Sequence, residues 1–145
     1  MSLGPTMATQ ITSDCLPLPG SRRAKILCID EDPQAADAIE LRMGDLAVDI
    51  LRASNGMQGY WLAISESPAL IITDLRMTNG HGGKIIESVK GNPQTRNIPV
   101  IVLTKHDYPG LQRHAQQMGA THCFQEPYDV SALLEAVSDV LALTK

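Results

Sequence analysis

From residue 24 onward, short apolar segments alternate with longer amphipathic segments along this chain. Segments this short and this apolar are typical of strands that are buried on both faces. Parallel strands need crossover connections, so the alternation predicts an α/β fold with a doubly wound, five-stranded parallel sheet and helices on both faces. The predicted strands are residues 24–29, 48–51, 70–73, 100–103 and 123–124.

A helix is predicted after each of these strands. The first is expected to begin at the N-cap Asp32 with Pro33 as its first helical residue, and its apolar positions extend to Leu46. The second covers residues 57–65, where Tyr60 and Trp61 are expected in the core or at its edge. The other three contain Ile85 to Val89, Leu111 to Met118, and Val130 to Leu141 after the cap Asp129.

Two groups of acidic residues directly follow predicted strands. Asp30, Glu31 and Asp32 follow the first strand, and Asp74 follows the third. The carboxyl ends of parallel strands lie at one edge of the sheet, where open α/β sheets bind their ligands. Two carboxylate groups at two strand ends therefore indicate one shared site. The alternative is that Asp32 and Asp74 only cap turns and helix starts.

Composition narrows the class of protein. The chain has 145 residues, enough for one domain with a full core, and residues 1–23 are rich in Pro and Gly without periodicity. We interpret 1–23 as a disordered tail, beginning with a cloning remnant, and 24–145 as the domain. The last predicted helix ends with the sequence, so no output domain is expected here.

Charge and special residue types exclude several functions. A net charge of -4 and few aromatic residues give no basis for direct nucleic-acid binding, and no apolar stretch is long enough for a membrane span. Three widely spaced cysteines fit neither a zinc site nor a disulfide framework, and they suggest reduced thiols in a cytoplasmic protein. The four histidines are scattered and are expected at the surface.

Motifs at the strand ends resemble those of response-regulator receiver domains, in the same order, over residues 24–143. The ordered set is more specific than any one of its members. The motifs are Ile-Leu-Cys-Ile-Asp-Glu-Asp-Pro at 26–33, Ile-Ile-Thr-Asp-Leu-Arg-Met at 71–77, Gly82, Ile-Pro-Val-Ile-Val-Leu-Thr at 98–104, and Gly119-Ala120 followed by Glu126-Pro127-Tyr128.

This resemblance implies a flavodoxin-like sheet of order 2-1-3-4-5 and a signalling module of a phosphorelay, with no catalytic residues of an enzyme. Asp74 would be the phosphoacceptor, with a sensor histidine kinase or a phosphotransfer protein as donor. Glu31 and Asp74, helped by Asp30 and the backbone carbonyl of Arg76, would hold Mg²⁺, since crowded carboxylates repel one another until a hard cation binds. The output partner is not specified, and a homodimer is possible.

The resemblance also assigns a switch and the neighbours of the phosphoryl group. Thr104 would hydrogen-bond the phosphoryl oxygen, and Cys123 occupies the position of the second switch residue, which is usually aromatic. Met77, Lys105 and Glu126 would surround the phosphoryl group.

Four positions differ from the usual receiver sequence. Glu126 replaces a lysine that contacts the phosphoryl group, and its negative charge would repel that group. Cys123 is small and apolar, and a buried core thiol is its simplest interpretation. Lys105 replaces a small residue, and we expect it to pair with Glu126 or to lean towards Asp74. Thr78 stands where a proline is usual.

Three hypotheses follow from these residues. The first is a phosphorylatable receiver domain, and the second is a receiver-like interaction module that does not depend on phosphate, as Glu126 suggests. The third is a small phosphohydrolase, because Asp30-Glu31-Asp32 also resembles the Asp-x-Asp motif of haloacid-dehalogenase-like enzymes, with Asp30 as nucleophile and Asp32 as acid. The sequence has no acidic pair after Asp74 of the kind that class needs.

Overall fold

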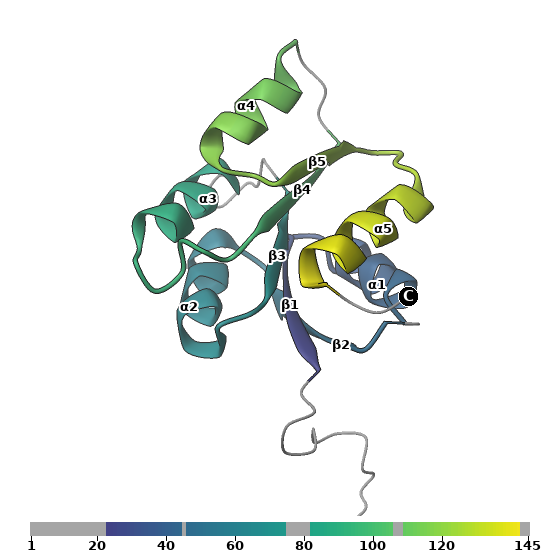
Figure 1. The fold of residues 1–145 in the computed structure, drawn as a ribbon, viewed down its shortest axis with the longest axis horizontal. Helices are drawn as coiled ribbons and strands as arrows, with labels where there is room; N and C mark the ends of the chain where they lie inside the picture. Colours follow the sequence, from purple (N-terminus) through teal and green to yellow (C-terminus); the bar gives the residue numbers. More distant parts are fainter. Residues whose placement is uncertain (1–22, 45, 75–81, 106–108, 143–145) are drawn as a thin grey trace, which may run out of the picture.

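The computed structural model describes residues 23–44, 46–74, 82–105 and 109–142, with no side-chain description at 82 and 83. Its centre is one parallel sheet with the strand order β2-β1-β3-β4-β5, which confirms the predicted fold (Figure 1). The predicted strands are all present, and three of them are one or two residues longer at an end. They are β1 (Ala24–Ile29), β2 (Val48–Ala53), β3 (Leu70–Thr73), β4 (Val100–Thr104) and β5 (His122–Gln125).

Five described helices cover the two faces of the sheet. In Figure 1, α1 and α5 lie together on one side, and α2, α3 and α4 form a layer on the other. This arrangement is the one that right-handed crossovers produce in a doubly wound sheet. The helices are α1 (Pro33–Arg42), α2 (Gly56–Glu66), α3 (Gly82–Gly91), α4 (Leu111–Met118) and α5 (Val130–Leu141).

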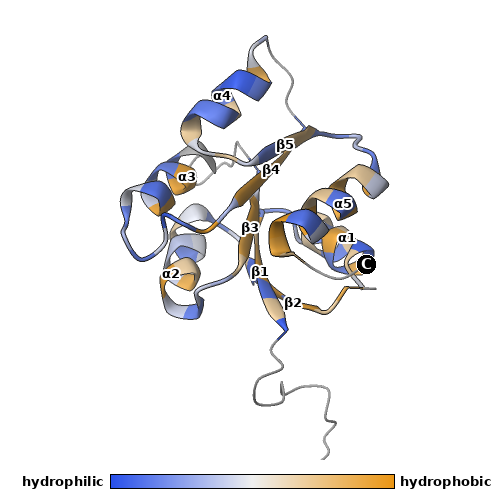
Figure 2. Ribbon diagram, viewed as in Figure 1, coloured by the Kyte–Doolittle hydropathy of each residue, from blue (hydrophilic) through white to orange (hydrophobic). Residues whose placement is uncertain are grey.

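Each face of the sheet has its own apolar core. Alternate residues of β1 point to opposite faces, so Leu27 and Ile29 pack with α2, α3 and α4 while Ile26 and Cys28 pack with α1 and α5. Every residue of β3 and β4 is buried. Figure 2 shows these two strands in the colour of hydrophobic residues, whereas α4 is mostly hydrophilic.

Local signals explain where the helices begin, and one expected end is wrong. The Asp32 carboxylate accepts a hydrogen bond from the Gln34 N–H, and Asp129 caps α5 in the same way. However, α1 ends at Arg42 rather than extending to Leu46. Met43 is the C-cap, and it still packs into the core together with Leu46 after the helix has ended.

The helix α2 lies unusually close to β1. A Cβ atom on Gly59 would lie 2.8 Å from Cγ1 of Ile29 and nearer still to Cδ1, so any larger residue there requires a shift. At the start of α2, the Gln58 N–H donates to Asn55 Oδ1, and Gln58 Oε1 accepts from the Ser54 N–H. This reciprocal cap fixes the first turn of the helix against the end of β2.

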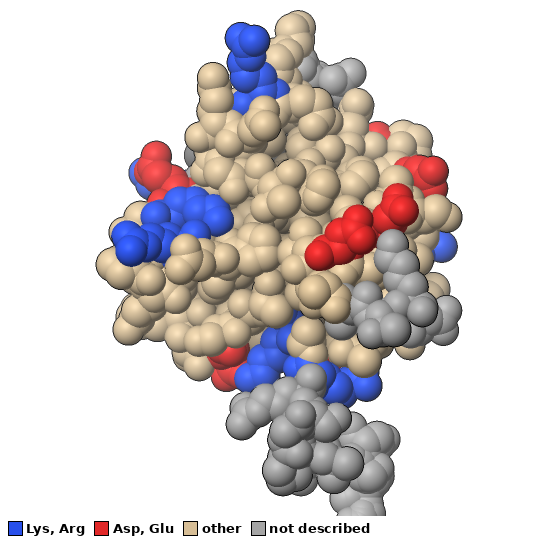
Figure 3. All heavy atoms as spheres, in the orientation of Figure 1, with Lys and Arg blue, Asp and Glu red and all other residues tan. Residues whose placement is uncertain are grey.

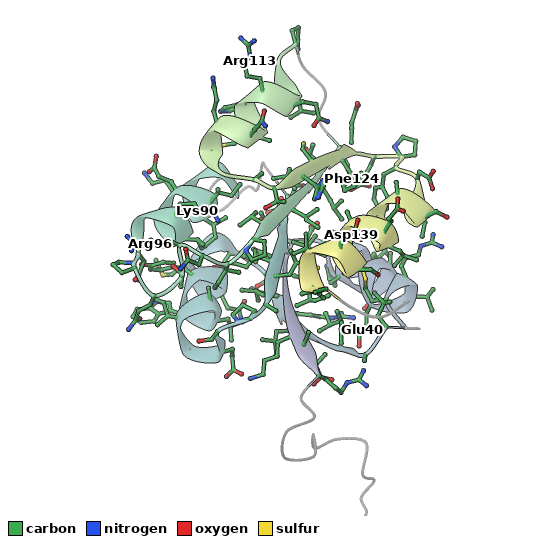
Figure 4. The ribbon with its side chains drawn as sticks, viewed as in Figure 1. Glu40, Lys90, Arg96, Arg113, Phe124 and Asp139 are labelled. Atoms are coloured by element: carbon green, nitrogen blue, oxygen red, sulfur yellow. The ribbon has the colours of Figure 1, made fainter. Side chains whose placement is uncertain are left out.

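Lys90, at the end of α3, connects three segments. Its ammonium donates to the carbonyl oxygens of Arg96 and Ile98, and its stem lies about 3 Å from where a Cβ atom of Gly119 would be. Figure 4 labels Lys90 and Arg96, which lie close together at this end of α3. Burial lowers the pKa of Lys90 from its usual value. A single side chain thus ties α3 to the loop before β4 and to the end of α4.

A search of the described residues finds no helix with the length and apolar character needed to cross a membrane.

Candidate functional site

The ends of β1 and β3 bring Asp30 and Asp74 together. Ile29 and Thr73 are partners in the parallel register of the two strands, and each carboxylate residue follows directly. The Asp74 N–H donates to the carbonyl oxygen of Ile29 at 3.4 Å, which keeps the two strand ends aligned. The backbone therefore places the two predicted carboxylates at one edge of the sheet, side by side.

Asp30 and Asp32 have different local roles. One carboxylate oxygen of Asp30 accepts a hydrogen bond from the Asp32 N–H at 2.8 Å, which orients the Asp30 side chain. Asp32 caps α1, which agrees with the alternative prediction that this residue only caps a helix start. Asp32 is thus part of the helix start, and Asp30 is the carboxylate of this pair that belongs to the site.

Three acidic residues act on the carboxyl group of Asp30. Burial raises the pKa of Asp30 above its usual value, and the negative charges of Asp74, Asp32 and Glu126 raise it further. The hydrogen bond from the Asp32 N–H partly opposes this increase in pKa. Negative charges at the ends of β3 and β5 therefore act on the carboxylate at the end of β1.

Glu126 directly follows β5, and its negative charge reaches Asp30. Its N–H donates to the carbonyl oxygen of Thr104 at 2.8 Å, which continues the pairing of β4 with β5. Its side chain is partly buried. Burial raises the pKa of Tyr128 above its usual value, and the negative charge of Glu126 raises it further. Glu126 therefore adds negative charge near Asp30, at the end of β5.

The predicted metal ligands can be tested only in part. The negative charge of Asp74 raises the pKa of Asp30, so these two predicted ligands lie near each other. Arg76, Met77 and Thr78 lie outside the described residues. Within the described residues, His, Cys, Asp and Glu side chains form no group of three that would hold a metal ion. The donor set still fits a hard cation, because partly buried carboxylates with mutual repulsion lose that repulsion when Mg²⁺ binds.

The switch positions lie on β4 and β5. Thr104 is completely buried at the end of β4. Cys123 is paired in register with Val102, is partly buried rather than fully buried, and its backbone carbonyl accepts a hydrogen bond from the Gln112 side chain at 3.0 Å. A hollow of about 230 Å³ lies beside Cys123, between α4 and β5.

Lys105 follows Thr104 and is exposed. The ion pairs of the described residues do not include one between Lys105 and Glu126, although the two residues follow paired positions of β4 and β5. The expected ion pair with Glu126 is therefore not among those of the described residues, and the alternative, that Lys105 leans towards Asp74, stays a prediction. The fixed backbone spacing brings the two positions together, but an exposed lysine gains little from such a pair.

One part of the site was not anticipated from the sequence. A hollow of about 240 Å³ adjoins Asp30 and Glu31, and it reaches across α1 to Arg52 and Gln58. Arg52 bonds to Asp37 at 2.6 Å and to Glu40 at 2.5 Å, so its charge is neutralised by α1. The predicted second strand stopped before Arg52, because a charged residue breaks an apolar run even when it lies on an edge strand.

Of the four histidines, His114 and His122 are exposed as expected. His81 and His106 lie outside the described residues.

Comparisons with known proteins agree with this geometry. The sequence model of the response regulator receiver domain matches residues 26–138, so the chain belongs to that family. It is 28% identical over 119 residues to Protein PilH of Pseudomonas aeruginosa, covering 82% of this chain and 98% of PilH. It is also 28% identical over 120 residues to the DNA-binding dual master transcriptional regulator RpaA of Synechocystis, covering 83% of this chain but only half of RpaA.

A solved structure with a similar fold is that of a response regulator from Desulfuromonas acetoxidans. It is 27% identical with a TM-score of 0.73, and the match covers 84% of this chain and 99% of the other. The chain is therefore a receiver domain of the kind found in two-component response regulators. This assignment favours the receiver hypotheses over the phosphohydrolase hypothesis, because Asp30 to Asp32 lie within the segment that the receiver model matches.

Proposed function

We propose that Asp74 accepts a phosphoryl group from a phosphohistidine of a sensor histidine kinase or phosphotransfer protein. The observation that carries the proposal is the register of β1 and β3, which sets Asp74 beside Asp30 at the ligand-binding edge of the sheet. A carboxylate oxygen of Asp74 would attack phosphorus, and the bond from phosphorus to the histidine nitrogen would break. With a proton already on its other ring nitrogen, the imidazole would keep the bonding electron pair and leave as the neutral base.

The residues around Asp74 would position the incoming group and balance its charge. Asp30, Glu31, Asp74 and the backbone carbonyl of Arg76 would hold Mg²⁺. When bound, the cation would neutralise charge on the transferred phosphoryl oxygens. Asp30 is held in place for this role by its hydrogen bond from the Asp32 N–H. Thr104 would donate its hydroxyl to a phosphoryl oxygen, and because it is buried, that bond would require its loop to move inward.

A second function is favoured by one observation, the negative charge of Glu126 within the field of the acidic site. In this alternative the domain is a receiver-like interaction module whose partner binds without phosphorylation. In either case we propose a cytoplasmic signalling role for residues 24–145 rather than an enzymatic one, with an output partner that neither alternative specifies.

Incubation with acetyl phosphate and Mg²⁺, followed by intact-mass measurement, tests the first function. We expect one phosphoryl adduct on the natural chain and none on Asp74→Asn. Asp49→Asn is the matched control, because it makes the same chemical change at the opposite edge of the sheet, where β2 begins. It should keep the adduct.

Peptide mapping of the labelled residue separates the alternatives. An adduct on Asp30 would contradict the assignment of Asp74. No adduct on the natural chain, together with an adduct on Glu126→Lys, would favour the phosphate-independent module.

A further inference from the structure

The outward side of α2 has an unusual composition. Met57, Gln58 and Ser65 share this side with Trp61, since each lies three or four residues from it, and all four are exposed. We call these four residues the α2 face. Met57 is 74% exposed and Trp61 is 63% exposed, whereas Gly59 and Ala63 on the opposite side of the helix are buried. Two large apolar side chains thus point away from the core of their own domain.

The α2 face is also electrically neutral. Residues 53–65 include no Lys, Arg, Asp or Glu. The charged residues on either side are already paired, Arg52 with two carboxylates of α1 and Glu66 with Lys25 at 3.1 Å. Figure 3 shows the surface over α2, at the lower left, almost entirely without blue or red.

The outer sides of the other described helices are different. Exposed charged residues occur on α1, α3, α4 and α5, for example Asp37, Lys84, Arg113 and Glu135. A chain with a net charge of -4 repels its own copies at most points of contact. Two copies meet with the least repulsion through a neutral face, whereas a strongly charged partner would gain nothing from this one.

We propose that the α2 face is a self-association surface, on which two copies of this chain pair around a two-fold axis. In such an isologous contact, Trp61 of each copy packs against Met57 of the other. Tryptophan and methionine are enriched in protein interfaces, and the thioether makes favourable contacts with an aromatic ring. The small Ser65 leaves room beside Trp61 for the partner helix. The inference is independent of phosphorylation and of the proposed phosphoacceptor.

The size of the face sets the strength of the dimer. Two largely exposed side chains of this size offer about 300 Å² per copy, well below the roughly 800 Å² per partner that stable complexes bury. The dimer is therefore weak, with a dissociation constant on the order of 100 μM.

Trp61 is the chain's single tryptophan, so intrinsic fluorescence reports directly on the α2 face. Raising the protein concentration from about 1 μM to about 1 mM, across the expected dissociation constant, should shift the emission to shorter wavelength as the indole leaves water. Sedimentation velocity over the same range should show the monomer converting to a dimer.

Met57→Glu should raise the dissociation constant at least tenfold, because it places two negative charges at the contact. Glu is favourable in the first turn of a helix, so this variant is expected to fold. Leu41→Glu on α1 is the matched control, since Leu41 is 78% exposed and the change in charge is identical. It should leave the fluorescence shift and the dimer unchanged.

Several results would overturn the proposal. One is an emission maximum and a sedimentation coefficient that stay those of a monomer up to about 1 mM, ten times the expected dissociation constant. Another is a loss of association in Leu41→Glu as large as in Met57→Glu. A third is a shift produced by neutral phosphatidylcholine vesicles at a low protein concentration but not by the protein itself, which would make the α2 face a lipid contact.

Discussion

The two halves of the acidic edge differ in how closely they follow the receiver pattern. The half built on β1 and β3 has the expected carboxylates, Asp30, Glu31 and Asp74. The half built on β4 and β5 has Thr104, but Lys105, Cys123 and Glu126 are three positions that the sequence resemblance predicts to depart from the receiver pattern. If the proposed function is correct, the first half receives the phosphoryl group and the second half responds to it.

The backbone is the same kind of scaffold in both halves. Register pairs Ile29 with Thr73 on one side and Thr104 with Gln125 on the other, so the strand ends meet at one edge throughout. The halves differ in the side chains at and just beyond the strand ends. Each half can therefore be altered by substitution without changing the sheet.

The largest effect is expected from Glu126→Lys. Replacing a negative charge near the phosphoryl group by a positive one is worth on the order of 1–3 kcal/mol after screening, which is roughly a fivefold to hundredfold increase in the lifetime of the phosphorylated state. Phosphoryl lifetime, followed by intact mass after removal of the donor, is the measurement. If the second half had no influence on the first, the lifetime would not change.

Gln125→Lys is the matched control for that substitution. Gln125 is exposed, directly precedes Glu126, and points to the other side of β5. The control adds a positive charge without removing the negative charge from the site. Glu126→Lys changes the charge by two units and Gln125→Lys by one, so a free-energy gain half as large in the control would show that net charge, rather than position 126, controls the lifetime.

The next largest effect concerns Mg²⁺ and the first half. Binding to the folded state alone stabilises it by about 1.4 kcal/mol when the cation is at about ten times its dissociation constant. The thermal midpoint of the natural chain should rise in millimolar Mg²⁺, and Glu31→Gln and Asp74→Asn should lose most of this increase. Asp49→Asn should retain it. A midpoint that does not respond to Mg²⁺ would count against a metal site.

A smaller effect is expected from Asp30→Asn without metal. The pKa of Asp30 is raised in the folded state, so the folded state binds its proton more tightly than the unfolded state does. The free energy of unfolding therefore falls as pH rises from the usual carboxyl range through the raised pKa, and a penalty remains at neutral pH.

Asp30→Asn should remove that penalty. We expect a gain in unfolding free energy on the order of 0.5 kcal/mol at neutral pH, already discounted for partial exposure. The gain should vanish at pH values below the usual carboxyl range, where Asp30 is protonated in both states. Denaturant unfolding at several pH values measures it. A loss of stability at neutral pH would mean that an unrecognised cationic partner holds Asp30.

The smallest effect compares two thiols, one in each half. Cys28 on β1 is fully buried, and burial followed by the charge of Asp30 raises its pKa to about 12. Cys123 on β5 is partly exposed, and burial raises its pKa as well. Since only thiolates react, Cys28 should label only after unfolding, while Cys123 labels slowly in the folded state.

Labelling with a thiol reagent in a Cys15→Ser variant measures both rates, because Cys15 lies outside the described residues. Phosphorylation should change the rate of Cys123 several-fold and leave that of Cys28 unaltered. Equal changes at both thiols would show that the two halves respond as one unit.

Much of the fold was predictable because it depends on local patterns. The boundaries of β1 and β3 agree exactly with the predicted strands, since both are apolar runs buried on both faces. The caps Asp32 and Asp129 were also correct. The end of α1 was not, because Met43 and Leu46 satisfy the helical spacing while reaching the same core from outside the helix.

The candidate site was predictable in part. Carboxylates that follow buried strands are visible in a sequence, and the register confirmed that Asp30 and Asp74 share an edge. The position of Arg52 was not predictable, because its pairing with α1 depends on the tertiary structure. Nor was the exposure of Trp61, since an aromatic residue within a helix usually faces a core. The pairing of Lys105 with Glu126 failed because proximity of backbones does not fix long side chains.

The close approach of α2 to Ile29 has a consequence for how this chain tolerates change. Ile29 directly precedes Asp30, so whatever displaces Ile29 also displaces the first carboxylate of the site. Gly59 leaves the space into which the Ile29 side chain extends. Gly59 has no functional group and is not one of the proposed phosphoryl-site residues, yet it restricts which substitutions leave Asp30 in its present position.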